Sequence, residues 1–117
     1  MGSKGMAASA HPLASLAGIN VLNKGGNAFD AIVAIASTLN VVEPFMSGMG
    51  GVGFGLVYQA KKKKLKFLDF SGFAPELADP EKFTEESKEI GPWAPVVPCN
   101  LAGWLTIQEE LGVLERE

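Results

Sequence analysis

The sequence has little of what many functional sites require. It contains one cysteine and one histidine, so an internal disulfide framework and a multi-thiolate metal site are excluded and a structural zinc site is not expected. Its net charge of −3 gives no electrostatic basis for binding nucleic acid or an anionic membrane. Its longest nearly unbroken apolar run, residues 31–42, is much shorter than the roughly 20 residues that span a bilayer. We therefore expect no metal, no cofactor, and neither a membrane nor a nucleic acid as partner.

The composition that remains is typical of one globular domain. The chain has 117 residues, of which 47% are apolar and 20% are charged, enough to bury a modest core. No apolar segment typical of a signal peptide follows Met1, which favours a cytoplasmic protein. The opening Met1-Gly2-Ser3 leaves a removed leader as an alternative.

Two helices are predicted in the first third of the chain. His11-Pro12 is typical of a helix start, because proline at the first helical position loses no hydrogen bond, and Lys24-Gly25 is typical of a helix end. Asn27 should cap the next helix with Asp30 near its free amides, and Pro44 should end it. That second helix is apolar nearly all round, which indicates a buried helix.

A β-hairpin is predicted to follow. Residues 51–58 alternate strictly, so that three glycines and Val57 share one face and four larger side chains share the other: Val52, Phe54, Leu56 and Tyr58. Glycines on one face indicate that a backbone or a ligand approaches closely there. Residues 65–70 should form the second strand. The four lysines between the strands are interpreted as a solvated turn rather than an anion site, because neighbouring lysines repel.

The remaining third is predicted to be mostly loop, with one helix at its end. Residues 71–98 are rich in proline and acidic residues, with a short helix possible around 80–88. Asn100 should cap a last helix that Gly112 closes, with its packed face formed by Leu101, Trp104, Ile107 and Leu111. Two strands are too few to bury the apolar helix. Residues 1–117 are therefore predicted to be a single partial domain of the α+β class, whose sheet needs further polypeptide on one side.

Several segments together resemble the N-terminal part of the large subunit of gamma-glutamyltranspeptidases. They occur in the family's order over about residues 6–114, as HPLASLAG, LNKGGNAFDA, VVEPFMSGMGGVGF, LDF, AP and VPCNLAGW. The resemblance is greatest to the signal-less, transpeptidase-like branch that includes acylases and an oxamate amidohydrolase. It implies a four-layer α/β/β/α N-terminal nucleophile hydrolase fold, to which this chain contributes helix, helix, β-hairpin, loop and helix.

The resemblance also implies a chemistry and its partners. Such a proenzyme cuts itself, and the new N-terminal threonine attacks an amide or gamma-glutamyl compound to form an acyl-enzyme. This chain contains no such threonine, so the resemblance assigns it no catalytic residue and predicts that it is inactive alone. Its expected partners are the rest of the large subunit, the small subunit that carries the nucleophile, and a small amide or gamma-glutamyl substrate.

The resemblance and the sequence pattern together give candidates for substrate contacts. Ser71, with Gly72, stands where the classical transpeptidases have an arginine that holds the substrate carboxylate, and Phe73 stands where the related branch has one. The alternative for Ser71 is a turn serine bonded to its own backbone. The loop glycines Gly48, Gly50 and Gly51 could present amides to an anion, or could only allow a tight connection.

Other reactive side chains are interpreted as structural. His11 should act as a helix cap and Cys99, at a usual glycine position of the family, as an inert thiol. Thr38 should bond its own helix backbone. A second class of function stays open, in which the chain is a truncated non-catalytic homologue that acts as a binding or assembly module.

Overall fold

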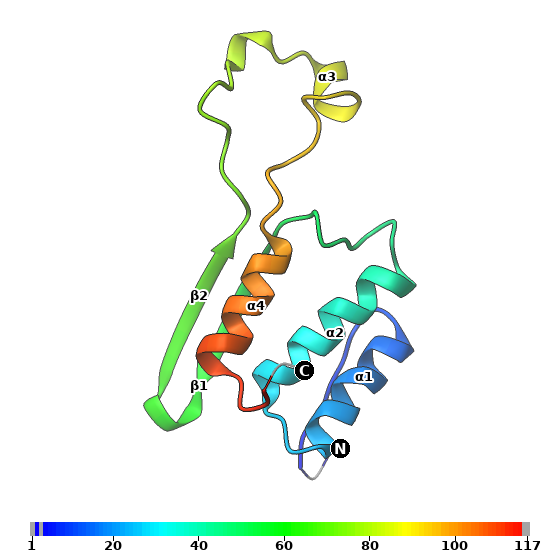
Figure 1. The fold of residues 1–117 in the computed structure, drawn as a ribbon, viewed down its shortest axis with the longest axis vertical. Coiled ribbons are helices and arrows are strands. Elements are labelled where there is room, and N and C mark those ends of the chain that lie inside the picture. Colours follow the sequence, from blue (N-terminus) through cyan, green and yellow to red (C-terminus); the bar gives the residue numbers. More distant parts are fainter. Residues whose placement is uncertain (1, 3, 116–117) are drawn as a thin grey trace.

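The structure, a computed structural model, describes residues 2 and 4–115. It is an α+β arrangement in which helices lie beside a two-stranded antiparallel sheet (Figure 1). Its extents are 53 × 31 × 29 Å, and the long dimension comes from a segment that extends away from the helices. The elements are α1 (Pro12–Asn23), α2 (Ala28–Val42), β1 (Gly53–Gln59), β2 (Lys64–Phe70), α3 (Glu85–Glu89), α4 (Asn100–Leu111) and three-residue 3₁₀ turns at Ala60–Lys62 and Pro80–Lys82.

The first two helices form as their sequence signals predict. The Nδ1 atom of His11 accepts a hydrogen bond from the Leu13 amide at 3.2 Å, and Gly25 takes the left-handed conformation after α1 with a φ of 93°. Asn27 and Asp30 form a reciprocal capping box at the start of α2. Gly18 of α1 lies against Ile35 of α2, where a Cβ would come within 2.7 Å of that side chain. The small residue therefore lets the two helices pack closely.

Asp30 also connects α2 to the end of α4, a role that the sequence did not predict. Its buried carboxylate accepts hydrogen bonds from the amides of Asn27, Val113 and Leu114. The Asn27 side chain donates to the Leu111 carbonyl at 2.7 Å. These bonds satisfy backbone groups at the end of one helix with the cap of another, and so hold α2 and α4 together.

The hairpin has the predicted strands, and its register places Gly53 opposite Phe70 and Gln59 opposite Lys64. The glycine face, where the sequence indicated a close approach, is the covered face of the hairpin. Gly55 lies near Ile107 of α4, and Val57 is buried, so α4 and α2 cover this face. Helices can approach because glycine leaves room for their side chains.

The opposite face of the hairpin is not covered. Its large apolar side chains are 59–69% exposed, and two of them, Phe54 and Phe67, stack with ring centroids 5.7 Å apart. We call this the bare hairpin face, formed by Phe54, Leu56, Tyr58, Leu65 and Phe67. An exposed apolar surface of this kind usually marks a contact with other polypeptide.

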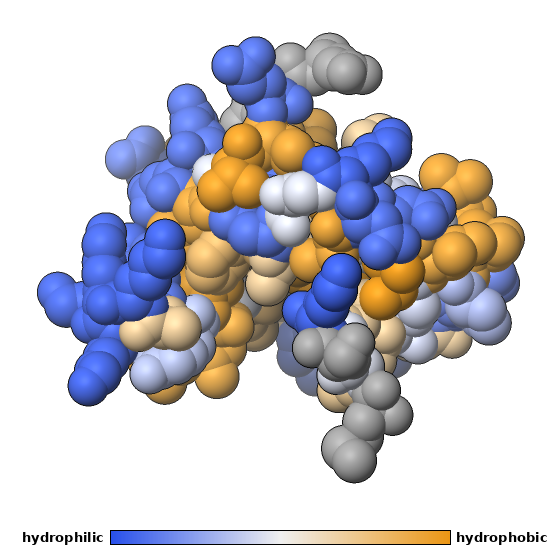
Figure 2. Space-filling view, turned by 90° about the horizontal axis from the view of Figure 1, so that it is seen from below, coloured by the Kyte–Doolittle hydropathy of each residue, from blue (hydrophilic) through white to orange (hydrophobic). Residues whose placement is uncertain are grey.

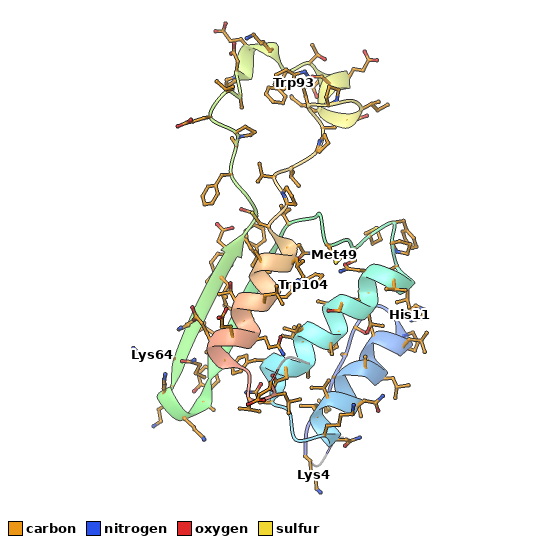
Figure 3. All side chains as sticks on the ribbon, viewed as in Figure 1. Lys4, His11, Met49, Lys64, Trp93 and Trp104 are labelled. Atoms are coloured by element: carbon orange, nitrogen blue, oxygen red, sulfur yellow. The ribbon has the colours of Figure 1, made fainter. Side chains whose placement is uncertain are left out.

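A long excursion, residues 71–99, connects β2 to α4. It extends beyond the helices as two limbs joined by Pro80–Lys82 and α3 (Figure 1). Trp93 lies in the far part of the excursion, whereas Trp104 lies on α4 near α2 (Figure 3). None of the helices in the part of the chain that the structure describes is long and apolar enough to cross a membrane.

The prediction that Asn100 caps α4 is wrong. Cys99 occupies the cap position, and Asn100 is the first helical residue. The Asn100 side chain instead donates to the Gly48 carbonyl at 2.8 Å, in a loop more than 50 residues earlier. The packed face of α4 also differs in part, because Trp104 and Ile107 are buried while Leu101 is exposed.

Candidate functional site

The candidate site lies at the end of the hairpin next to the start of α4. Ser71 and Gly72 directly follow β2, and the glycine loop (residues 48–51) ends one residue before β1. Because Gly53 pairs with Phe70, these two segments meet at the same end of the sheet. A Cβ on Gly72 would lie 3.5 Å from the Val52 side chain. The structure therefore brings together both groups of residues that the sequence analysis singled out.

Ser71 lies in a turn that Asp69 organises. The Ser71 amide donates to the Asp69 carboxylate at 2.9 Å. Hydrogen bonds from the Ser71 side chain and backbone hold the pKa of Asp69 below its ordinary value. The amide hydrogen bond is an Asx turn made by Asp69, not a bond from the Ser71 hydroxyl to its own backbone. A substrate contact through Ser71 stays a prediction.

Gly72 is required by the path of the chain. Its φ is +83°, and a Cβ there would lie 2.7 Å from the Val97 carbonyl oxygen. The residue therefore sits where the two limbs of the excursion approach each other. Any side chain at this position would be strained and would push the limbs apart.

The glycine loop is fastened to the start of α4. The Gly51 carbonyl accepts hydrogen bonds from the amides of Cys99 and Asn100, at 3.1 and 2.9 Å. The Gly51 amide donates to Gly48 at 3.0 Å, so it is already used within the loop. Gly51 therefore has a structural role here, and anion binding by this loop stays a prediction.

Glycine is not required for steric reasons at Gly48 or Gly50. A Cβ at either position would meet nothing within 4 Å, and neither backbone has the positive φ that favours glycine. We expect Gly48→Ala and Gly50→Ala to change the free energy of unfolding by less than about 0.5 kcal/mol. Denaturant unfolding measures the change in the free energy of unfolding. Gly51→Ala is the comparison with less space, because its Cβ would lie 3.2 Å from the Gly48 oxygen. A loss of activity without a loss of stability would indicate a functional role, and a large destabilisation would contradict the open geometry.

Within residues 2 and 4–115, the candidate nucleophiles and bases named from the sequence are not assembled into a catalytic group. His11 caps α1, and Thr38 and Thr106 donate to carbonyls of their own helices, at 2.8 and 2.9 Å. Thr84 caps α3. Cys99 is half-buried and lines a cavity of about 390 Å³ between β2 and α4, together with Phe70 and Gly103. In the described part of the chain, no cluster of three or more metal-binding side chains is present.

Sequence reasoning missed two features around this site. The sequence did not predict the hydrogen bond from the Asn100 side chain to the Gly48 carbonyl, because an asparagine at a helix start is also typical of a cap. The edge contact between Phe83 and Trp93 in the excursion, at 5.5 Å between ring centroids, joins residues in a segment without periodicity. The prolines and aromatics of that segment were the only available signal.

Comparisons with known proteins agree on one family. The family profile for gamma-glutamyltranspeptidase matches residues 14–116. A glutathione hydrolase proenzyme from Bacillus subtilis (strain 168) is 50% identical over 94 residues, which cover 80% of this chain and 16% of that protein. The acylase ACY 1 proenzyme from Pseudomonas sp. (strain SE83) is 36% identical over 126 residues, covering 97% of this chain and 22% of that protein.

A solved structure is also similar. The Helicobacter pylori gamma-glutamyltranspeptidase matches with a TM-score of 0.92 and 36% identity. The match covers 98% of this chain and 35% of that chain. This chain therefore spans only a minor part of the length of each relative.

Proposed function

Because this chain belongs to the gamma-glutamyltranspeptidase family, we propose that it forms an N-terminal scaffold segment of an enzyme acting on small amides or gamma-glutamyl compounds. In this proposal a threonine outside the 117 residues becomes N-terminal by self-cleavage, and its hydroxyl attacks the amide carbonyl while its own amino group takes the proton. The C–N bond breaks, the amine leaves with a proton, and an acyl ester remains. Water then releases the acid, or a second amine accepts the acyl group.

The bare hairpin face is the observation that carries this proposal. Its apolar side chains are mostly exposed although the opposite face of the same two strands is covered by helices. The end of the molecule seen in Figure 2 likewise has hydrophobic side chains at its surface beside hydrophilic ones. The relatives have several times more polypeptide than this chain. A further layer supplied by such polypeptide would bury this face and place the nucleophile near the hairpin.

We favour hydrolysis over acyl transfer to an amino acid. Ser71 and Phe73 stand at the two positions where the resemblance implies an arginine. A serine hydroxyl can donate one hydrogen bond to a carboxylate but supplies no charge, whereas arginine supplies a bidentate, charged contact. An amino acid acceptor would bring a further carboxylate into a site without that charge, whereas water brings none.

We expect residues 1–117 produced alone to self-associate through the bare hairpin face. The double variant Leu56→Lys with Phe67→Glu should reduce this association, because both side chains are exposed and their charges oppose burial between copies. Sedimentation velocity measures the association. The matched control is Leu77→Lys in the excursion, which is 92% exposed and lies off the hairpin. If the wild-type chain is a monomer that unfolds cooperatively, the face needs no partner and the scaffold proposal is contradicted.

Mass spectrometry of the complete gene product tests the chemistry directly. We expect two polypeptides, one of them beginning with a threonine that is internal in the coding sequence. Amide hydrolysis should appear only after this cleavage, because the threonine amino group is the base. An uncleaved, inactive product that ends at residue 117 would instead support the non-catalytic binding or assembly module.

A further inference from the structure

The excursion contains an apolar pocket that the proposed chemistry leaves unexplained. The pocket has a volume of about 640 Å³ and lies between the two limbs of the excursion, next to Ser71. Its walls include Gly72, Phe73, Phe83, Trp93, Pro95 and Val96. Small-molecule sites typically have volumes of about 300–1,000 Å³ and mostly apolar walls. This pocket fits both criteria.

The walls of the pocket are stiff and aromatic. Phe83 and Trp93 meet edge to face, with an interplanar angle of 72°. Pro75, Pro80 and Pro95 fix the backbone around them. Trp93 is 47% exposed, so part of its ring is accessible to a ligand. Aromatic side chains favour a flat ring as partner, because offset or edge contacts add to the gain from burial.

The pocket offers almost no partner for a charged ligand. Among the described residues that line it, Lys88 is the one with a charged side chain, and its Nζ lies 2.6 Å from the Glu85 carboxylate. A charged group inside would lose water without gaining an unpaired opposite charge. An uncharged group has no such cost.

We propose that the excursion pocket binds an uncharged aromatic group of the small amide on which the complete protein acts. This inference rests on the proposed function, and it adds that the amide lies beside Ser71 and Gly72, which line the mouth of the pocket. The aromatic group enters between the limbs and packs on Trp93 and Phe83, while the amide stays near the end of β2. The pocket thus selects for aromatic amides, and it selects against amides whose ring carries a carboxylate, because Lys88 is already paired with Glu85 and the carboxylate would lose water without gaining an unpaired positive charge.

The test compares three amides as ligands of the complete gene product: benzamide, acetamide and 4-carboxybenzamide. We expect benzamide to bind about tenfold more tightly than acetamide, because its ring is buried, and 4-carboxybenzamide to lose this gain. Isothermal titration calorimetry gives the affinities. Benzamide should also shift the indole N–H resonance of Trp93, assigned with Trp93→Phe. Equal affinity for benzamide and acetamide, or tighter binding of the carboxylated ring, overturns the proposal.

Two variants locate the binding. Trp93→Ala removes an aromatic wall, and Val96→Glu places a charge on a wall residue that is 51% exposed and can therefore be solvated in the folded protein. Both should abolish the preference for benzamide, whereas Leu77→Ala, on the same excursion but outside the pocket lining, should keep it. If Trp93→Ala does not fold, the Val96→Glu variant alone tests whether the preference for benzamide depends on the pocket. A preference that survives Val96→Glu overturns the proposal.

The two proposals fail in different ways. An uncleaved gene product without amide-hydrolysing activity refutes the proposed function, whatever benzamide does. A cleaved, active protein that does not prefer benzamide to acetamide refutes only the assignment of the pocket.

Discussion

Asp30→Ala is expected to lower the free energy of unfolding by about 3 kcal/mol. The substitution leaves three backbone amides without their acceptor, those of Asn27, Val113 and Leu114. Each buried donor left unpaired costs roughly 1–3 kcal/mol. Because Asp30 is only 4% exposed, water cannot replace the carboxylate without rearrangement. Urea unfolding of the complete gene product, followed by circular dichroism, measures the loss.

The control for Asp30 is another aspartate at a helix start. Asp79 accepts one hydrogen bond, from the Glu81 amide at 3.1 Å, and its side chain is 42% exposed. Asp79→Ala should cost at most about 1 kcal/mol, because water replaces the lost acceptor. Equal losses in the two variants would show that the connection between α2 and α4 contributes nothing beyond helix capping.

Gly72→Ala is expected to be nearly as damaging, at about 3 kcal/mol. Forcing alanine into the left-handed region costs about 1–2 kcal/mol. The added methyl group would also lie 2.7 Å from the Val97 carbonyl oxygen, and relieving such overpacking costs about 1–3 kcal/mol. Because the limbs of the excursion would separate, any activity that depends on the end of β2 should fall as well. Denaturant unfolding and amide hydrolysis by the complete gene product measure the two effects.

Gly91→Ala separates the two contributions. Gly91 also has a positive φ, of +107°, but a Cβ there would meet nothing within 4 Å. Its substitution should therefore cost only the conformational part, about 1–2 kcal/mol. If Gly91→Ala and Gly72→Ala destabilise equally, the contact with Val97 is not tight and the limbs are free to move apart.

Local signals in the sequence were sufficient for most of the secondary structure. Proline after His11, the asparagine and aspartate of the capping box, and the proline after α2 act within a few residues of their own position, so the chain itself specifies these helix ends. The alternation in residues 51–58 predicted the strand, observed at Gly53–Gln59, for the same reason. The candidate site was predicted only in part. The order of segments pointed to Ser71 and the glycine loop, but it did not predict that they lie at the same end of the hairpin.

Local signals of this kind could not predict contacts between segments that are far apart in the sequence. Asn100 has the same local preference whether it caps its own helix or donates to Gly48, and only the position of the loop decides between them. Gly112 was predicted to close α4, which it does, but with an ordinary φ of −68°. Its lack of a side chain matters because a Cβ would lie 2.5 Å from the Asp30 carboxylate.

The sequence by itself determined the family, the helices and the hairpin, since each depends on the order of residues along the chain. Only the tertiary structure decided which face of the hairpin is covered. Alternation assigns side chains to two faces but does not say which face meets a helix. That choice depends on volume: the glycine face leaves room for Ile107 of α4, whereas the large side chains of the opposite face stand out from the strands and stay exposed in these 117 residues.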